Sequence, residues 1–590
     1  MATKLKETDA VMVGMGWTGS ILARELTKAG LNVIGLERGN DMKPSDAFAI
    51  PAIRDELRYT RRQELIQDPA LETLTLRHSP AEVALPMRRF GAFLPGTGVG
   101  GAGNHWGGQH WRYLPSDHEL RTHLTQRYGA KAIPGDMTIA DWPMTYAELE
   151  PYYERFEKLC GVSGKAGNLN GRKIAGGNTF EGPRQSDYPN PPVKRSYSNL
   201  MFEAAANNLG YHPFPQPVSN ASRPYTNTEG LTLGACQHCG FCDRAGCEAN
   251  AKAGPHTTLL PVLRADPRFT MRAGAWVSRL LYDKQARKVT GVVYTDTASG
   301  EEYEQPATLV ILSAYVFGNV SLLLNSGIGA AYDPATEQGV VGKNYCYQTH
   351  VDTTLFFEGK EFNPFMASPG NLTVIDDFNA DNFDHSGLDF VGGAVIRAGN
   401  TTGQPISQRP VPPGTPRWGS EWKRATAKWY RASFNIGCEG SNYANRKNYL
   451  SLDPTYRDGL GRPLVRMTYN FVDNDTKMRR YIAQQVDRIA KSMNPTAIAG
   501  PRFDTGDFNV VPYQSTHNTG GTIAGADPKS SVVNRYLQSW DADNLFVMGA
   551  SVFPQQVGYN PTGPVGALAY WAADAITTRY LKNPGPLVHA

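Results

Sequence analysis

The sequence contains few cysteines, no long apolar run and little excess of either charge. Its 590 residues include seven cysteines, 59 lysines and arginines, and 55 aspartates and glutamates, for a net charge of +4. Such a small net charge gives no support to nucleic-acid binding, and so few cysteines make no disulfide framework. No apolar stretch approaches the roughly 20 residues that cross a bilayer. We therefore expect no nucleic-acid partner, and no export signal or membrane anchor in the chain itself.

The composition is typical of a large globular protein. Hydrophobic residues make up 41% of the chain and charged residues 19%, which does not suit a disordered chain. A length of 590 residues exceeds what one core usually supports, so at least two domains are expected.

The N-terminus carries a dinucleotide-binding pattern. A strand is expected over residues 9–14, followed by the turn Gly14-x-Gly16-x-x-Gly19, a helix, and a second strand that ends at Glu37. The first glycine allows the tight turn, the second lets the backbone approach a pyrophosphate, and the third lets helix and strand pack closely. The acid about 20 residues further on would bind a ribose hydroxyl. The pattern predicts a dinucleotide site but does not distinguish FAD from NAD.

A second glycine-rich run, GTGVGGAGNHWGG, covers residues 96–108. A surface loop of this kind would expose Trp106 and Trp111, whereas glycine at this density lets a backbone lie close against a flat or charged group. We expect this loop to pack on the cofactor. The residues assigned to the cofactor site from this run are Gly98, Gly101, Asn104, His105, Trp106 and Gly107.

Four of the seven cysteines lie in the stretch CQHCGFCDRAGC, at positions Cys236, Cys239, Cys242 and Cys247. Structural zinc sites usually use two cysteine pairs separated by a longer loop. One tight run is more typical of iron–sulfur ligands. The spacing therefore favours an iron–sulfur cluster, with zinc and a purely structural or disulfide role as alternatives.

The C-terminal region carries a histidine and an asparagine that suit alcohol oxidation. His517 lies in STHNTGGT, a buried strand is expected before Gly549 and Ala550, and Asn560 opens the stretch NPT with Pro561 and Thr562. A neutral histidine can take the hydroxyl proton near pH 7. An asparagine can hold the oxygen as it becomes a carbonyl without changing its own charge.

Together these motifs resemble the glucose–methanol–choline (GMC) oxidoreductase family of FAD enzymes. The resemblance implies FAD as cofactor and His517 with Asn560 as the catalytic pair. It also implies that the second glycine run lies along the flavin ring, with His105 either bonded covalently to the flavin or hydrogen-bonded near it. Gly549 and Ala550 would lie against the ribityl-phosphate arm. The further cofactor residues assigned by the resemblance are Thr18, Arg38, Val277, Pro561 and Thr562.

Within the family, the chain is similar to the large flavoprotein subunits of bacterial membrane-bound sugar and sugar-acid dehydrogenases. That similarity implies a [3Fe–4S] cluster held by three cysteines. Because four cysteines are clustered here, either one of them is not a ligand or the cluster is of another type, and Cys160 could pair with a spare cysteine in a disulfide. It also implies a small chaperone-like partner that carries the export signal, a multihaem cytochrome c subunit, and a place on the periplasmic face of the inner membrane.

The same similarity favours D-gluconate, oxidised at C2 to 2-keto-D-gluconate, as substrate. Fructose, glucose, sorbitol, oxidation of a glucoside at C3, and a soluble oxidase that uses oxygen remain alternatives. An anionic substrate needs cations, and the arginines considered for this role are Arg88, Arg89, Arg112, Arg431 and Arg446.

The predicted fold class is α/β, with a Rossmann-like FAD-binding domain and an antiparallel-sheet α+β substrate domain. Strand patterns and motifs place the FAD-binding domain over residues 1–345 and 515–590, with the cysteine loop at 234–254. The alternating stretches VDTTLFFEG and NLTVIDDF place the substrate domain over residues 346–514.

Overall fold

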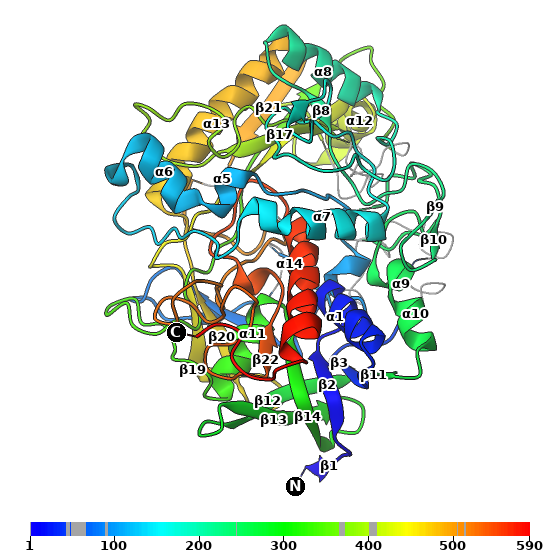
Figure 1. The fold of residues 1–590 in the computed structure, drawn as a ribbon. Helices are drawn as coiled ribbons and strands as arrows, with labels where there is room; N and C mark the ends of the chain where they lie inside the picture. The colour runs from blue at the N-terminus through cyan, green and yellow to red at the C-terminus, as the bar shows by residue number, and fades with distance from the viewer. Residues whose placement is uncertain are drawn as a thin grey trace.

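The computed structural model describes residues 2–42, 48, 66–88, 93–242, 245–364, 372–399, 410–503, 505–512 and 515–589. Two large sheets organise the chain, one at the bottom and one at the top of the view in Figure 1. Over these ranges, none of the helices has both the length and the apolar character needed to cross a bilayer.

The lower sheet joins strands from both ends of the chain and from its middle. Its strand order is β11–β3–β2–β14–β13–β12, and β1 and β22 also pair with β14. Strands β11, β3, β2 and β22 pair in parallel, whereas β12, β13 and β14 form an antiparallel meander. The strands are β1 (Thr3–Lys4), β2 (Thr8–Val13), β3 (Val33–Glu37), β11 (Phe269–Ala273), β12 (Ala275–Asp283), β13 (Lys288–Asp296), β14 (Glu302–Leu312) and β22 (Leu545–Val547).

Strand β14 holds the N-terminal and C-terminal segments together. Its Val310 lies opposite Val11 of β2 on one side and opposite Leu545 of β22 on the other. The carboxyl ends of parallel strands meet at one edge of a sheet, where α/β proteins bind their ligands. This register places the two distant glycine turns, after β2 and after β22, at the same edge of the sheet.

The first glycine turn has no room for a side chain. Gly14 has a φ of +94°, and a Cβ there would lie 2.5 Å from the Ser313 carbonyl oxygen. A Cβ on Gly19 would lie 2.1 Å from the Gly14 carbonyl oxygen. The turn therefore requires glycine for its backbone conformation at the first position and for close helix packing at the other.

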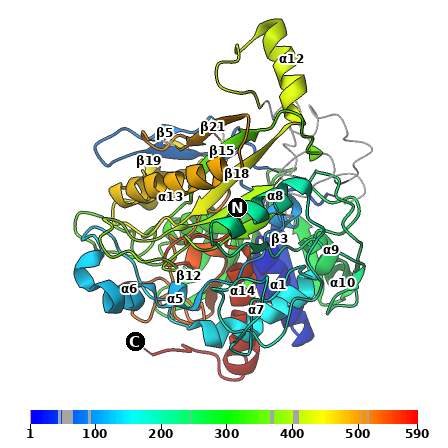
Figure 2. The same ribbon diagram turned by 90° about the horizontal axis from the view of Figure 1, so that it is seen from above.

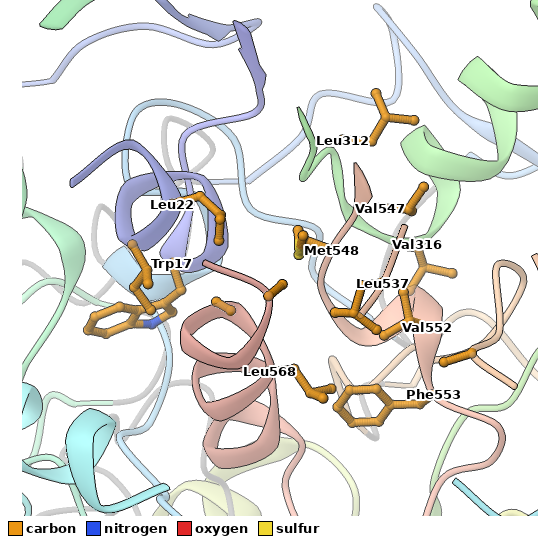
Figure 3. Packing of buried hydrophobic residues seen from close by; sticks show 14 of the residues in the cluster. Trp17, Leu22, Leu312, Val316, Leu537, Val547, Met548, Val552, Phe553 and Leu568 are labelled. Carbon is orange, nitrogen blue, oxygen red and sulfur yellow. The ribbon is translucent and has the colours of Figure 1, made fainter. Parts of the chain in front are cut away.

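Helix α14 packs between α1 and α7 beside this edge. Figure 3 shows Trp17 and Leu22 of α1 on one side of α14, and Leu568 of α14 beside Phe553 on its other side. The Trp17 ring meets Phe156 of α7 edge-on at 5.1 Å and Trp106 of the second glycine run at 5.7 Å. The helices of this part are α1 (Trp17–Lys28), α5 (Pro115–His118), α6 (Leu120–Tyr128), α7 (Tyr146–Cys160), α9 (Pro255–Thr258), α10 (Leu260–Ala265), α11 (Tyr315–Asn325) and α14 (Thr562–Ala575).

The upper sheet has the order β21–β15–β18–β17–β16–β8, and every pairing in it is antiparallel. Helices α13 and α8 pack on it, and Figure 2 shows α12 projecting away from it. Ile396 and Cys438 share an apolar cluster with Ile482 of α13. Neighbouring residues in a strand point to opposite faces, so Arg397 and Glu439 point away from α13. The elements are α8 (Tyr197–Asn208), β8 (Phe214–Pro215), β15 (Thr349–Phe356), β16 (Thr373–Ile375), β17 (Ala394–Gly399), α12 (Gly419–Tyr430), β18 (Ser433–Gly440), α13 (Asp473–Ser492) and β21 (Ala497–Arg502).

A four-stranded sheet, β19–β20–β4–β5, completes the arrangement. Its strands are β4 (Leu74–Arg77), β5 (Leu85–Pro86), β19 (Tyr449–Arg457) and β20 (Pro463–Thr468). The predicted fold class is confirmed: a mixed, mainly parallel sheet with helices lies below an antiparallel sheet with helices. Strands β4 and β5 belong to this four-stranded sheet, and β8 and α8 belong to the upper sheet and its helices, although all four elements lie outside residues 346–514.

A buried ion network ties α7 to the chain that follows the second glycine run. Both carboxylate oxygens of Glu157 accept hydrogen bonds from Arg112, at 2.7 and 2.8 Å, and one also accepts from Arg184 at 2.6 Å. Burial by itself would raise the pKa of Glu157, but the two guanidinium groups outweigh it and lower the pKa to about 2. Arg112 also donates to Glu150 at 2.7 Å. Its charge is therefore already paired inside the protein.

We predict that Glu157→Gln lowers the free energy of unfolding by about 3 kcal/mol at pH 7, because it leaves two buried guanidinium groups without their shared carboxylate. The depressed pKa stabilises the fold above the ordinary value of 4.5 and loses its effect as the pH falls toward 2. The difference between wild type and variant should shrink over that range. Chemical denaturation at several pH values measures it.

The matched control is Glu361→Gln, which breaks an exposed pair with Arg431. Exposed pairs contribute at most about 1 kcal/mol, so this control should leave the unfolding curve nearly unchanged. Equal losses in the two variants would contradict a special role for the buried network.

Candidate active site

A cavity of about 360 Å³ is lined by the carboxyl edge of the lower sheet and by the polar face of the upper sheet. It collects residues that are hundreds of positions apart in the sequence. The predicted site residues that line it are Gly14, Gly16, Thr18, Glu37, Arg38, Gly101, His105, Trp106, Gly107, Val277, His517, Gly549, Ala550, Asn560, Pro561 and Thr562. The structure thus brings the glycine turns and the C-terminal pair together around one space.

Three residues assigned to the cofactor do not line this cavity. Gly19 packs against the Gly14 carbonyl, as its predicted role in helix packing requires. The Asn104 side chain is buried and donates to the Val99 carbonyl at 2.8 Å. Gly98 has a φ of +87° and accepts, at its carbonyl, the Gly101 N–H at 2.8 Å. These three shape the backbone of the glycine turns.

Glu37 lies at the end of β3 and points back under the first glycine turn. Its two carboxylate oxygens accept hydrogen bonds from the backbone N–H groups of Met15 and Gly39, each at 3.0 Å. Burial outweighs these bonds and raises the pKa of Glu37. Each oxygen keeps a lone pair for a second donor such as a ribose hydroxyl. The acid is therefore held in the position that the dinucleotide pattern predicts.

The predicted catalytic pair, His517 and Asn560, is held by a directional chain of hydrogen bonds. Trp111 Nε1–H donates to Asn560 Oδ1 at 3.0 Å, and Asn560 Nδ2 lies 3.1 Å from His517 Nε2. On the other side of the ring, His517 Nδ1 contacts Gln348 Oε1, and it lies 2.5 Å from Ser515 Oγ. The chain begins at an indole, which can only donate, so the amide of Asn560 must turn its NH₂ toward the histidine.

This direction assigns the tautomer of His517. An NH₂ facing Nε2 requires a lone pair on that nitrogen, and Nδ1 therefore carries the proton in the neutral ring. The amide of Gln348 agrees, because its Nε2 lies 3.5 Å from the carbonyl oxygens of Val557 and Tyr559 and turns Oε1 toward the histidine. The structure thus presents a basic nitrogen and an amide donor side by side in the cavity wall.

Trp111 and Gln348 are site residues that the sequence motifs missed. The sequence indicates only that Trp111 is buried, and Gln348 lies in an ordinary strand-like stretch directly before β15. No sequence signal marks Gln348, since its role depends on the strand lying beside the loop of His517. Ser515 stands in the same motif as His517 and could have been assigned from it.

The cysteine loop packs against the second glycine run. Lys252 is buried, and its ammonium group donates to the carbonyl oxygens of Trp106, Cys242 and Ala245, at 2.5, 2.8 and 2.6 Å. Trp106 Nε1 in turn donates to the Ala253 carbonyl at 2.8 Å. One lysine therefore joins the loop that carries the cysteines to a tryptophan that lines the cavity.

The described thiols are not gathered into a finished ligand set. Within the described ranges, which omit residues 243 and 244, no group of three or more His, Cys, Asp or Glu side chains is placed to hold a metal ion. Cys242 is buried, and its sulfur accepts a hydrogen bond from Asn220 Nδ2 at 3.3 Å. Cys160 carries a free, buried thiol in α7, so the disulfide considered for it is not formed.

The arginines considered for an anionic substrate lie elsewhere. Arg112 is paired with Glu150 and Glu157 in the buried network. Arg431 and Arg446 pair at the surface with Glu361 and Glu337. Arg88 is exposed and does not line the cavity, and Arg89 falls outside the described residues. The cations among the described residues that do line the cavity are Arg38, Arg397 and Arg462.

Comparison with known proteins agrees with this geometry. A family model described as GMC oxidoreductase matches residues 143–350, and a second with the same description matches residues 444–569. The gluconate 2-dehydrogenase flavoprotein of Pantoea cypripedii is 48% identical over 100% of this chain and 97% of its own. The fructose dehydrogenase large subunit of Gluconobacter japonicus is 26% identical over 98% of this chain and 99% of its own. The crystal structure of pyridoxine 4-oxidase from Mesorbium loti shares the fold, with a TM-score of 0.60 at 16% identity over 97% of this chain and 99% of that chain.

The fold and the site define an FAD-dependent alcohol oxidoreductase, with a glycine-turn cradle for the dinucleotide and a histidine–asparagine pair beside it. The chain belongs to the GMC oxidoreductase family. The resemblance inferred from the motifs is thereby confirmed. The assignments of individual cofactor residues, including a bond at His105, stay predictions.

We predict that Trp111→Phe slows reduction of the bound flavin by substrate about tenfold while FAD content is unchanged. Phenylalanine keeps an aromatic ring against Tyr559, on which Trp111 stacks at 4.6 Å, but it lacks the N–H that orients Asn560. A lost hydrogen bond of about 1 to 1.5 kcal/mol corresponds to that factor. Anaerobic stopped-flow absorbance measures the rate.

Trp142→Phe is the control, because Trp142 is buried and its Nε1 has no hydrogen-bond partner among the described residues. The flavin bound to this variant should be reduced by substrate at the wild-type rate. A normal rate in Trp111→Phe would show that the amide of Asn560 needs no donor from the indole.

Proposed function

We propose that this protein is the flavoprotein subunit of a sugar-acid dehydrogenase that oxidises the C2 hydroxyl of D-gluconate. The single observation that carries the proposal is the oriented His517–Asn560 pair within the cavity of a chain 48% identical to a gluconate 2-dehydrogenase flavoprotein. A secondary alcohol needs a base for its proton and a donor for its oxygen, and the pair supplies both.

His517 is the base of the proposed reaction. Its Nε2 carries the lone pair, and that atom lies in the cavity wall beside the Asn560 amide. It takes the proton of the substrate hydroxyl, after which both ring nitrogens carry protons. The proton on Nδ1 stays bonded to the oxygen of Gln348, so the ring keeps its orientation as its charge changes.

Asn560 positions the oxygen of the substrate. Its NH₂ carries two donors, one facing His517 Nε2 and one left for the substrate oxygen, and its carbonyl is held by Trp111, so the amide need not turn during the reaction. A preorganised donor stabilises the negative charge that grows on the oxygen as its proton leaves. Asn560 is buried and His517 is half-buried, which limits the access of water to these bonds.

The residues that would hold FAD are those around the glycine turns. The cradle after β2, the acid at Glu37, and the Gly549–Ala550 turn after β22 line the cavity with backbone and leave it open. When FAD is bound, it supplies the hydride acceptor of the reaction.

We further propose that electrons leave through the cysteine loop, with an iron–sulfur cluster and a cytochrome c subunit as acceptors. Two observations support this exit route: four cysteines share one short loop, and Lys252 ties that loop to the cavity-lining Trp106. Since the described thiols do not form a ligand set, cluster assembly would have to move the loop. A small partner with an export signal, and a site of action on the periplasmic face, complete this proposal.

Anaerobic bleaching of the flavin by a panel of sugars and sugar acids tests the substrate. We expect D-gluconate to bleach the wild-type flavin fastest, and His517→Ala to abolish bleaching while FAD remains bound, because the substitution removes the nitrogen that takes the proton. His78→Ala, which changes a histidine paired with Glu82 away from the cavity, is the control. Fast bleaching in His517→Ala would remove the base assignment. Faster bleaching by fructose, glucose, sorbitol or a glucoside would show that this compound, rather than D-gluconate, is the substrate.

We predict that Cys242→Ser leaves flavin reduction by substrate intact but slows electron transfer to a cytochrome c acceptor at least tenfold, since serine is a poor ligand for iron. Cys438→Ser, a buried cysteine in β18 of the upper sheet, should transfer at the wild-type rate. Iron content and the rate of cytochrome reduction are the measurements. Unchanged transfer in Cys242→Ser, or fast peroxide formation without iron, would favour an oxidase instead.

A further inference from the structure

The upper sheet turns a pair of opposite charges toward the catalytic cavity. Arg397 on β17 and Glu439 on β18 both line it, and Arg397 Nη2 lies 2.5 Å from Glu439 Oε1. In the strand register, Glu439 lies opposite Val395 and Arg397 lies opposite Gly437. Residues two apart in a strand share a face, so both charged side chains leave the same face of the sheet.

Each member of this pair has an unused hydrogen-bonding atom. Arg397 Nη1 and Glu439 Oε2 are buried and have no hydrogen-bond partner among the described residues. The guanidinium carries five N–H donors and the carboxylate about four acceptor sites, so one salt bridge leaves capacity on both. Burying such atoms unsatisfied costs free energy. A ligand that offers an acceptor to Arg397 and a donor to Glu439 would recover that cost.

Among the described residues, Arg397 is the cavity-lining cation at this end of the cavity, and its acidic neighbours are Glu439 and Asp352. Asp352 lies opposite Arg502 in β21 and across Gly437 from Arg397, so it interacts electrostatically with both cations. His350, opposite Glu439, is kept neutral because burial lowers its pKa to about 3. The electrostatic neighbours of His350 include both Arg397 and His517, which places the charged pair and the catalytic base around one residue.

The other two cavity-lining arginines are used at the dinucleotide end. Arg38 follows Glu37 and bonds to Glu72 and Gln67. Arg462 bonds to Asp458 at 2.8 Å and to the Val277 carbonyl at 3.2 Å, and lies over the Trp276 ring at 4.4 Å. Neither offers its charge to a substrate beside His517.

We propose that Arg397 and Glu439 are the recognition pair for a 2-hydroxy acid. Arg397 Nη1 donates to the substrate carboxylate, and Glu439 Oε2 accepts from one of its hydroxyl groups. A carboxylate bonded to the carbon that is oxidised must lie close to the catalytic pair, and Arg397 is the described cation that shares that part of the cavity. This inference rests on the proposed sugar-acid function and names the residue that distinguishes a sugar acid from a neutral polyol.

The test compares the second-order rate constants for flavin bleaching by D-gluconate and by D-glucitol, in which CH₂OH replaces the carboxylate. In the holoenzyme, Arg397→Met should lower the preference for gluconate by about 10- to 100-fold, the range for a hydrogen bond to a charged group. The loss should appear mainly in KM, with the rate at saturation changed little. Arg397→Lys should recover part of the preference, because it keeps the charge but not the planar fork.

Two further variants test whether the effect of Arg397→Met comes from misfolding or from the loss of any arginine. Arg397→Met leaves the Glu439 carboxylate buried without its partner, so Arg397→Met combined with Glu439→Gln removes both charges and should fold with FAD bound. The double variant should show the same loss of gluconate preference. Arg431→Met, which removes a surface arginine of the same region, should behave as wild type.

The outcomes separate this inference from the proposed function. If gluconate bleaches the wild type and the Arg397 variants equally well, or if gluconate and glucitol lose rate in parallel, Arg397 does not read the carboxylate. If the wild-type flavin is bleached by neutral sugars and not by any sugar acid, the sugar-acid function itself is wrong. A loss confined to the carboxylate substrate supports the recognition pair.

Discussion

The pairing of β14 with β2 on one side and β22 on the other is the interaction on which the site depends. It joins segments separated by more than 200 residues into one parallel edge, and both glycine turns follow directly from it. The backbone hydrogen bonds of this register place the dinucleotide cradle and the C-terminal segment on the same side of the sheet. Without that register, His517 and Asn560 would have no fixed position relative to the glycine turns.

The hydrogen bonds around the proposed catalytic pair show how a buried donor sets the orientation of the Asn560 amide and the position of the proton on His517. Histidine and asparagine side chains can each present either of two atoms, and both are ambiguous when taken alone. The indole of Trp111, which can only donate, removes the ambiguity for Asn560, and Asn560 then assigns the lone pair of His517. Gln348 closes the chain from the far side. A base and an oxyanion donor thus result from packing around residues that touch no substrate.

The upper sheet contributes the proposed recognition pair, Arg397 and Glu439, to the same cavity. Its apolar face is anchored by α13, which leaves the opposite face free to carry charge toward the cavity. Arg397 looked unremarkable in the sequence, because one arginine in an alternating strand is usually solvated. The arginines that stood out instead, such as Arg112, prove to be committed to buried or surface ion pairs. Charge alone could not show which arginine is available to a substrate, since that depends on which charges already have partners.

The sequence by itself determined the class of fold, the family and the glycine turns, and it predicted His517 and Asn560 as the catalytic pair. Those features are local: a turn that only glycine can adopt, an acid at a set distance from it, and short motifs around His517 and Asn560. Only the tertiary structure decided the direction of the hydrogen bonds and the roles of Trp111 and Gln348. It also decided which arginines are already paired with acids, and the contact between the cysteine loop and Trp106. These features depend on which distant segments of the chain lie together. Strand register and burial decide those contacts, and the local sequence around each residue carries no signal of them.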